Sequence, residues 1–426
     1  MTQHPQSSDN NKKKNISPIL WILVVVAITI NLRPFLTAIG PLGQAVSTAT
    51  GMNLSQLSWL TLLPMALMGV GAWVAPTALN KLGAKNAISG SLLLIALGCA
   101  LRLVANDTAV LLATAALCGA GVALVQGILP GVIKRQSPNS VAPMMGLYSC
   151  ALMGGGALGA QISPLAMQSG WSWQSALALW TIPALMAVPL AWYALGRIQA
   201  MVKTPTPTTA STTTTTPTTP TTSNANDTSW LTRRPRTWLL MACFGLINGG
   251  YASVVAWLAP YYQTHGWSAA SSGTLVAILS IAQATAALGL PALAARHIDR
   301  RPWIAFTLLC QIIGFAVLVW MPDVAPVLNA IVLGVGLGGC FALMMVVALD
   351  HLSSPAQAGA LNALMQGGGF ILAATAPWIV AQLHEFTGNF ESGWLYHLCA
   401  VCVVCVLVAR LAPARYAQAM QMERAS

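Results

Sequence analysis

The residue whose chemistry most needs an explanation is an arginine inside an apolar stretch. Arg33 lies in the apolar segment 18–40, near its middle, at about 6 Å of helix from the midpoint. A guanidinium at that depth in an apolar medium costs several kcal/mol unless it faces water or a partner. No Asp or Glu occurs inside any apolar segment of the chain. The expected partners of Arg33 are therefore backbone carbonyls, water, or an anionic or acceptor-rich solute.

The residue after Arg33 is a proline that should bend the chain. Pro34 removes an intrahelical hydrogen bond and disfavours helical geometry at the residue before it, which is Arg33 itself. A kink frees backbone carbonyls, so the pattern allows two interpretations. Arg33 either presents its donors to a solute or is held permanently by the freed carbonyls.

The composition shows that the setting of this arginine is a membrane. The 426 residues are 56% hydrophobic and 7% charged, against about 25% charged in a soluble domain, which excludes a soluble globular protein. A bilayer crossing takes about 20 apolar residues. Twelve such segments occur, at residues 18–40, 57–79, 86–105, 108–133, 142–166, 173–195, 237–262, 270–294, 303–320, 324–349, 357–381 and 393–412. The expected fold is an all-α integral membrane protein with twelve transmembrane helices.

The positions of the charged residues orient these segments. Basic residues outnumber acidic ones by 20 to 9, which in a soluble protein would suggest nucleic acid. Here the basic residues cluster in the two termini and in the connections after even-numbered segments, whereas the opposite connections carry acids and no Lys or Arg. By the positive-inside rule we expect both termini to be cytoplasmic. The expected location is a bacterial-type inner (plasma) membrane. Besides Arg33 only Arg102 breaks this pattern, and it lies close enough to the outer end of its segment to snorkel outward.

The two halves of the chain repeat one another. Matching features recur at an offset of 213 to 217 residues, among them Asn31 with Asn248 and the glycine triplets 154–156 and 367–369. Between the halves, residues 204–229 are almost only Thr, Pro, Ser, Ala and Asn, a composition that stays solvated. The expected domains are a cytoplasmic N-terminal tail (1–17), an N-terminal six-helix bundle (18–196), a Thr/Pro-rich cytoplasmic linker (197–236), a C-terminal six-helix bundle (237–412) and a cytoplasmic C-terminal tail (413–426).

This repeat resembles that of a known superfamily. Because each half contains an even number of segments, both halves keep one orientation, as in the major facilitator transporters, whose substrate site lies near the midplane between the halves. The connections after the second and eighth segments resemble the basic glycine-containing loop of that superfamily, which it links to conformational switching. Together with Pro34, the residues expected to take part are Asn80, Lys81, Gly83, Lys85, Arg296, Asp299 and Arg300. Asn80 stands where an aspartate is usual, and a plain positive-inside anchor is the alternative interpretation.

A more specific resemblance starts around Arg33. The segment Asn31–Pro34 with the following Gly40–Pro41, joined to the later turn Tyr262–Ser268, looks like the cyanate and 2-nitroimidazole transporter family of the major facilitator superfamily. The resemblance covers essentially the whole chain apart from the linker and tails. It implies secondary transport of a small planar or anionic solute and does not itself fix the substrate.

The helix arrangement of the superfamily would turn several polar residues inward. With Arg33, the candidates for substrate binding are Asn31, Asn248, Tyr251, Gln126, Gln283, Asn362 and Gln366. Asn248 stands out because it is the repeat mate of Asn31. For each residue taken alone, an interhelical hydrogen bond is at least as good an explanation as a substrate contact.

The cysteines do not indicate a disulfide framework, because all 9 lie inside apolar segments. Cys399, Cys402 and Cys405 share one helical stripe, which would allow a soft-metal site. We favour the explanation that these three cysteines serve as small apolar residues in a peripheral helix. We therefore expect no metal site and no cofactor.

The leading hypothesis is a secondary transporter that carries a small anion or a neutral acceptor-rich molecule by alternating access, and not an enzyme. Its expected partners are the solute, the lipid bilayer and, as an option, a coupling ion such as H+; no nucleic acid is expected, and the chain should be a monomer. A proton-coupled exporter of cationic drugs is the alternative, but such exporters usually need a carboxylate inside the membrane. Asp350 and His397 are the only plausible titrating groups close to the membrane. A membrane-embedded enzyme is a remote alternative, because the six histidines are scattered.

Overall fold

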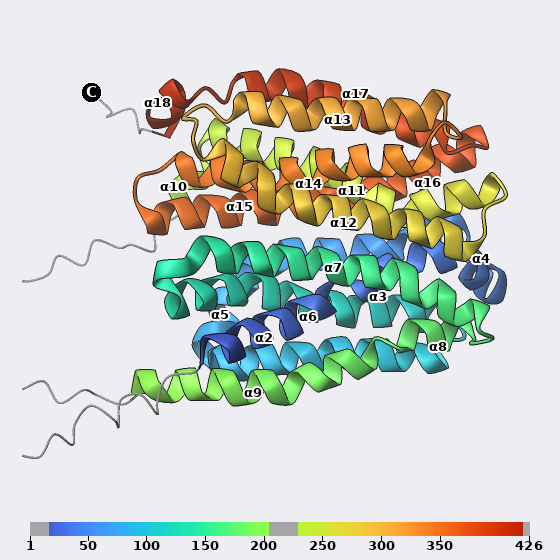
Figure 1. Ribbon diagram of the computed structural model, residues 1–426, viewed down its shortest axis with the longest axis horizontal. Coiled ribbons are helices and arrows are strands. Elements are labelled where there is room, and N and C mark those ends of the chain that lie inside the picture. Colours follow the sequence, from blue (N-terminus) through green and yellow to red (C-terminus); the bar gives the residue numbers. More distant parts are fainter. Residues whose placement is uncertain (1–16, 204–228, 421–426) are drawn as a thin grey trace, which may run out of the picture.

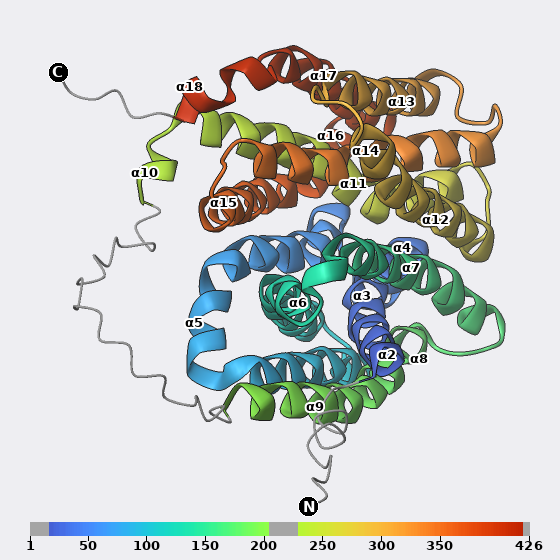
Figure 2. The same cartoon turned by 60° about the vertical axis from the view of Figure 1, so that its left-hand side comes forward.

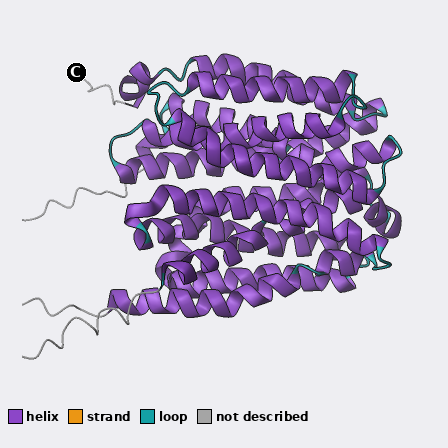
Figure 3. Cartoon of the chain, in the orientation of Figure 1, coloured by secondary structure: helices purple, strands orange, loops and turns teal. Residues whose placement is uncertain are grey.

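The computed structural model describes residues 17–203 and 229–420. These residues form helices joined by short turns, and no strand occurs among them (Figure 3). The remaining residues, 1–16, 204–228 and 421–426, include most of the expected linker and parts of both expected tails, so those predictions lie largely outside the described residues.

The chain forms two sets of helices, one from each half. The N-terminal set is α2 (Pro18–Thr29), η1 (Ile30–Leu32), α3 (Pro34–Thr37), α4 (Ile39–Thr50), α5 (Leu54–Ala100), η2 (Leu101–Val104), α6 (Thr108–Gln136), η3 (Pro138–Ser140), α7 (Val141–Gln168), α8 (Trp173–Ala178) and α9 (Thr181–Lys203). The C-terminal set is α10 (Ser229–Thr232), α11 (Pro235–Thr264), α12 (Ala269–Ala294), α13 (Arg301–Trp320), α14 (Pro326–Asp350), α15 (Pro355–Ala374), α16 (Ala376–Thr387), α17 (Glu391–Ala409), η4 (Pro413–Arg415) and α18 (Tyr416–Met420). In Figure 1 the two sets lie one above the other with their long helices running in the same general direction.

Eleven helical stretches of the described chain are long and apolar enough to cross a membrane, and one of them accounts for two crossings. The stretch Leu54–Val104 has 51 residues, or about 75 Å of helix, more than twice the thickness of a bilayer core. It reverses at Gly83, whose φ of 74° and ψ of 161° are not helical, and Figure 2 shows α5 folding back on itself. A residue with a side chain rarely adopts this φ. The prediction of twelve transmembrane helices is confirmed.

The halves meet along helices rich in small residues. Helix α5 packs on α15, and α7 packs on α12. A methyl group added at Gly69 of α5 would lie 2.7 Å from the carbonyl oxygen of Gly367 in α15, and one added at Gly273 of α12 would overlap the carbonyl oxygen of Ala160 in α7. In lipid, such small residues allow the close backbone approach on which helix packing depends.

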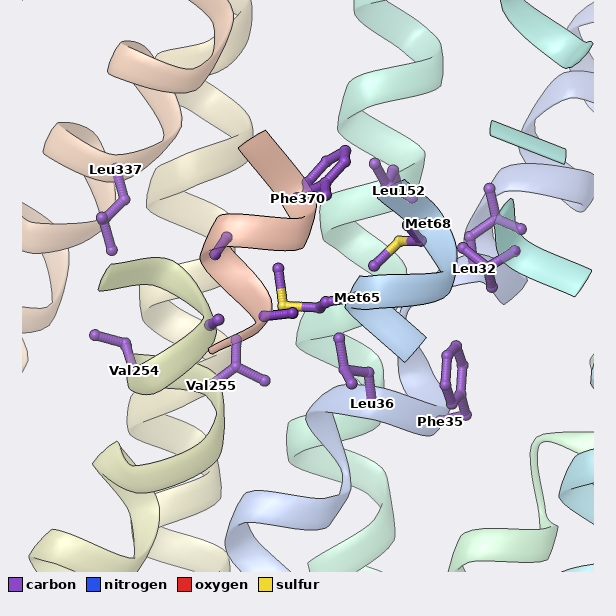
Figure 4. Packing of buried hydrophobic residues seen from close by; sticks show 14 of the residues in the cluster. Leu32, Phe35, Leu36, Met65, Met68, Leu152, Val254, Val255, Leu337 and Phe370 are labelled. Atoms are coloured by element: carbon purple, nitrogen blue, oxygen red, sulfur yellow. The ribbon is translucent and has the colours of Figure 1, made fainter. Parts of the chain in front are cut away.

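The first transmembrane segment is not a single helix. Arg33 separates η1 from α3 with φ of −124° and ψ of −26°, which agrees with the bend expected from Pro34. Its apolar neighbours Phe35 and Leu36 belong to one continuous buried cluster that also contains Met65 of α5 and Val255 of α11 (Figure 4). The break in the first segment therefore lies in the packed region between the two halves.

Candidate functional site

Arg33 points from the broken segment toward the other half of the molecule. Its side chain is 5% exposed, and Nη1 donates a hydrogen bond of 3.3 Å to the hydroxyl oxygen of Tyr251 in α11. Its Cζ atom lies 5.0 Å from the centroid of the Tyr251 ring, a distance at which a cation is attracted to the ring face. None of the ion pairs in the described ranges involves Arg33. A buried guanidinium is thus held by an aromatic residue without a carboxylate.

A small cavity lies beside this contact. Four of the polar candidates border it, namely Arg33, Asn248, Tyr251 and Gln283, and its apolar wall consists of Met153, Ile247, Leu337 and Phe341. Its volume is about 20 Å³, which is room for about one water molecule. The lining offers donors from a guanidinium, a hydroxyl and two amides against an apolar wall. Such a set suits a compact solute with strong acceptors.

Two equivalent asparagines have different surroundings. Asn31 donates from Nδ2 to the Ala27 carbonyl oxygen at 2.7 Å, and Asn248 donates in the same way to the Phe244 carbonyl oxygen at 2.8 Å. Only Asn248 borders the cavity. The side chain of Asn31 is buried and bonded within its own segment, so its bond is neither a contact with the cavity nor the interhelical hydrogen bond that the sequence left open.

The other sequence candidates are not brought into this cavity. Gln126, Asn362 and Gln366 are half-buried and do not line it. The Oδ1 atom of Asn362 is buried without a hydrogen-bond partner in the part of the chain that the structure describes.

Helix α7 fixes the position of the break that carries Arg33. A methyl group added at Gly155 would overlap the carbonyl oxygen of Ile30 in η1. At the next residue of α7, the Gly156 carbonyl oxygen accepts a hydrogen bond of 2.7 Å from the hydroxyl of Thr37. The glycines of α7 let the irregular backbone of the first segment approach closely, so the bend at Arg33 is held by packing and hydrogen bonding.

The connection within α5 contacts the helix that ends its own half. Asn80 and Lys81 are exposed, whereas Lys85 places Nζ 3.7 Å from the centroid of the Trp192 ring in α9. Gly83 lies against the side chain of Gln199 in the same helix.

The connection between α12 and α13 caps helix ends. Arg300 donates from Nη1 to the carbonyl oxygens of Ala294 and His297 at the end of α12 and pairs with Asp350 at the end of α14 through a 3.2 Å contact. Asp299 pairs with Arg301 at 2.7 Å, and the hydrogen bonds from Arg301 hold the pKa of Asp299 below its usual value. Arg296 is exposed and borders a separate cavity of about 840 Å³ at this end of the C-terminal half.

Sequence reasoning missed or misplaced several residues. The four apolar residues of the cavity wall carry no signal that separates them from other apolar residues. Arg102 was expected to snorkel outward, but this was wrong: it is 0% exposed and donates from Nη1 to the Phe35 carbonyl oxygen at 3.0 Å. Its proximity to the end of the third segment did not reveal that α8, α5 and α6 pack around it or that it bonds to the first segment.

The fold and the central polar site are those of a membrane transporter of the major facilitator class. The model of the Major Facilitator Superfamily matches residues 21–377, and the chain belongs to this superfamily. It is therefore a multi-pass secondary transporter and not an enzyme.

Two relatives make the likeness more specific. The chain is 41% identical to the cyanate transport protein CynX of Escherichia coli (strain K12), over 93% of this chain and 98% of the relative. It is 30% identical to the 2-nitroimidazole transporter of the same organism, over 92% of this chain and 94% of the relative. The resemblance drawn from the segment around Arg33 is confirmed.

Solved structures share the fold at low identity. The crystal structure of a D-xylose-proton symporter matches with a TM-score of 0.71 and 13% identity, covering 92% of this chain and 97% of the other. That of a bacterial homologue of the human lysosomal transporter Spinster matches with a TM-score of 0.66 and 15% identity, covering 95% and 98%.

Proposed function

We propose that this protein carries a small anionic or acceptor-rich solute of the cyanate or nitroimidazole kind across the inner membrane. The observation that carries the proposal is Arg33, a guanidinium 5% exposed that borders a cavity between the halves and has no carboxylate partner in the described ranges. An anion or a nitro group would supply the acceptors for which such a donor set is built. The names of the two relatives agree with this class.

The size and lining of the cavity narrow the solute further. A space of about 20 Å³ admits about one water-sized group, so the site fits a compact solute or one functional group of a larger one. The ring of Phe341 gives part of the lining a flat apolar surface, which suits a planar or linear molecule.

The contacts between the halves support alternating access as the transport mechanism. Nε2 of Gln263, near the end of α11, donates to the Pro41 carbonyl oxygen of α4 at 2.9 Å. The backbone N–H of Ser55 donates to Oε1 of Glu385 in α16 at 3.1 Å. Both contacts join the halves beside α4, at the end away from α10 and α18 (Figure 1). Hydrogen bonds of this kind can break when this end opens.

The charge of the site argues against the cationic alternative. The cavity lining contains no carboxylate, so a cationic drug would meet the charge of Arg33 without a compensating group. The same lining offers no acid to exchange a proton with the solute, so coupling to H+ would need a group elsewhere in the chain.

We place both termini and the linker in the cytoplasm because the basic connections lie on that side. A single chain encloses the cavity, which supports a monomeric transporter. A reporter fused within residues 204–228 should behave as cytoplasmic in intact cells. Labelling of that segment from outside the cell would overturn this orientation.

The substrate proposal is tested at Arg33. Radiolabelled cyanate should bind the purified full-length protein, and Arg33→Gln should lower the affinity roughly ten- to hundredfold, because a charge-assisted hydrogen bond contributes about 1.5–3 kcal/mol. Arg33→Lys should bind more weakly than the native protein, since a point ammonium cannot reproduce a guanidinium fork. Nitroimidazole competition in the same assay tests the second solute of this class.

A control separates binding from folding. Arg135→Gln removes an exposed cation at the end of α6 and should leave cyanate binding unchanged. Folded Arg33→Gln protein that binds and transports cyanate normally would remove Arg33 from the site. Misfolding of both Arg33 variants would instead favour the interpretation in which Arg33 only stabilises the kink.

A further inference from the structure

Arg102 is the second buried arginine of the N-terminal half, and it contacts the segment that carries Arg33. The residue lies in η2 at the end of the third transmembrane segment, with 0% of its side chain exposed. Nη1 donates to the Phe35 carbonyl oxygen at 3.0 Å, and Cζ lies 5.8 Å from the centroid of the Phe35 ring. Phe35 is two residues from Arg33, so Arg102 contacts the short piece of chain that carries Arg33.

The bonded carbonyl lies where the helical hydrogen-bond pattern is interrupted. Helix α3 contains only the four residues Pro34–Thr37, and the carbonyls at the end of a helix lack intrahelical partners. Arg102 supplies a donor for the Phe35 carbonyl, while Thr37 is bonded to Gly156 on another side. The direction of α3, and with it the direction in which Arg33 leaves the backbone, is therefore set in part by Arg102.

The internal repeat provides a comparison for this contact. Gly98 and Gly314 are equivalent at an offset of 216 residues, which makes Leu318 the mate of Arg102. The first segment of the C-terminal half, α11, is one helix over Pro235–Thr264. An arginine thus occurs at this position in the half whose first segment is broken, and a leucine occurs in the half whose first segment is continuous.

Stability alone does not account for the arginine. Nε and Nη2 of Arg102 are buried and have no hydrogen-bond partner in the described part of the chain. A buried charge with few partners is a poor stabiliser, and replacing such groups by apolar residues often leaves a protein equally stable or more so. The leucine of the other half shows that this architecture accepts an apolar residue at the position.

We infer that Arg102 is a positioning residue for solute binding, which holds α3 through the Phe35 carbonyl and thereby aims the guanidinium of Arg33 at the cavity. The inference rests on the proposed function, because it assumes that Arg33 binds the solute. Arg102 itself does not border the cavity. Its effect should therefore appear only through Arg33.

A double-mutant cycle with radiolabelled cyanate and the full-length protein tests this dependence. In the native background, Arg102→Leu and Arg102→Gln should weaken binding roughly three- to tenfold, the range for loss of one hydrogen bond, and Arg102→Lys should restore part of the affinity. In the Arg33→Lys background the same changes should have less than about a twofold further effect. A lysine has no planar guanidinium whose orientation Arg102 could determine. Folded protein in the membrane is quantified for every variant.

The outcomes separate this inference from the proposed function. Normal cyanate binding by Arg33→Gln would remove the proposed function and the inference together. If Arg33→Gln binds weakly but the Arg102 variants bind normally, or lose the same factor in both backgrounds, only the inference fails. Failure of all three Arg102 variants to accumulate as folded protein would assign Arg102 a structural role and also overturn the inference.

Discussion

The first segments of the two halves share one pattern up to Asn31 and Asn248 and differ after it. Asn31 and Asn248 occupy equivalent positions, and each donates to the carbonyl four residues earlier, at 2.7 and 2.8 Å. After that point α11 continues as one helix through Gly250 and Tyr251, whereas the first segment stops at Arg33 and restarts at Pro34. The repeat therefore provides the helix arrangement, and the departure from the repeat provides the arginine that we propose binds the solute.

The difference also assigns complementary roles to the halves. The broken segment contributes the charged donor, and the continuous segment contributes the Tyr251 hydroxyl that accepts from it at 3.3 Å. If the first segments of the two halves were identical, one could not supply a cation while the other supplied its aromatic partner. If this comparison is right, changes that disturb the break should harm the protein more than equivalent changes in the second half.

The largest such effect should come from the glycines that face these segments. Gly155 and Gly368 are repeat mates at an offset of 213 residues. A methyl group added at Gly155 would overlap the backbone carbonyl of Ile30, whereas one added at Gly368 would meet the end of the flexible Met241 side chain. Overpacking against backbone costs about 1–3 kcal/mol or more. We therefore expect Gly155→Ala to lower the yield of folded protein and its melting temperature well beyond Gly368→Ala.

The neighbouring glycine provides the control for that experiment. Gly154 has no atom within 4 Å of an added methyl group, so Gly154→Ala should leave the melting temperature nearly unchanged. Equal destabilisation by Gly155→Ala and Gly368→Ala would show that the break is not packed more tightly than its counterpart.

The next effect should follow from removing the proline at the break. Pro34→Ala restores a backbone N–H and relieves the restriction on Arg33, so the first segment can approach the continuous form of α11. We expect cyanate affinity to fall roughly tenfold, a loss of about 1.4 kcal/mol, while folded protein still accumulates. Pro189 is an exposed proline inside α9, and Pro189→Ala should not change binding. Unchanged affinity in Pro34→Ala would mean that the contacts with α7 and Arg102, and not the proline, keep Arg33 in place.

The sequence predicted the number and arrangement of the transmembrane helices better than the residues of the site. Apolar segment lengths and the distribution of charges predicted twelve crossings, since hydrogen bonding in lipid leaves few alternatives to helices. The repeat offset also predicted that Asn31 and Asn248 are equivalent, and the Arg33–Pro34 pair predicted the break in the first segment. These features follow from local composition and from proline geometry.

What the sequence could not predict depends on which helix faces point at each other. Nothing local distinguishes Gln283, which borders the cavity, from Gln126 and Gln366, which do not. Arg102 lies near the end of a segment, where an arginine normally reaches the membrane surface. It is buried because η2 packs against α8, α5 and α6, and its hydrogen bond to the first segment joins residues that are 67 positions apart.

The smallest effect on cyanate binding should distinguish Asn31 from Asn248. It tests whether contact with the cavity or the equivalent position in the repeat determines the role of each asparagine. Both amide groups are bonded to a carbonyl of their own segment, so loss of either side chain removes one buried hydrogen bond, about 0.5–1.5 kcal/mol. Only Asn248 borders the cavity, where its remaining amide atoms are available to a solute. Asn248→Ala should therefore weaken cyanate binding roughly two- to fivefold more than Asn31→Ala, while the two variants lose similar amounts of thermal stability. Equal affinities for the two variants would leave Asn248 with the same structural role as Asn31. The solute would then be recognised by Arg33, Tyr251 and Gln283 without it.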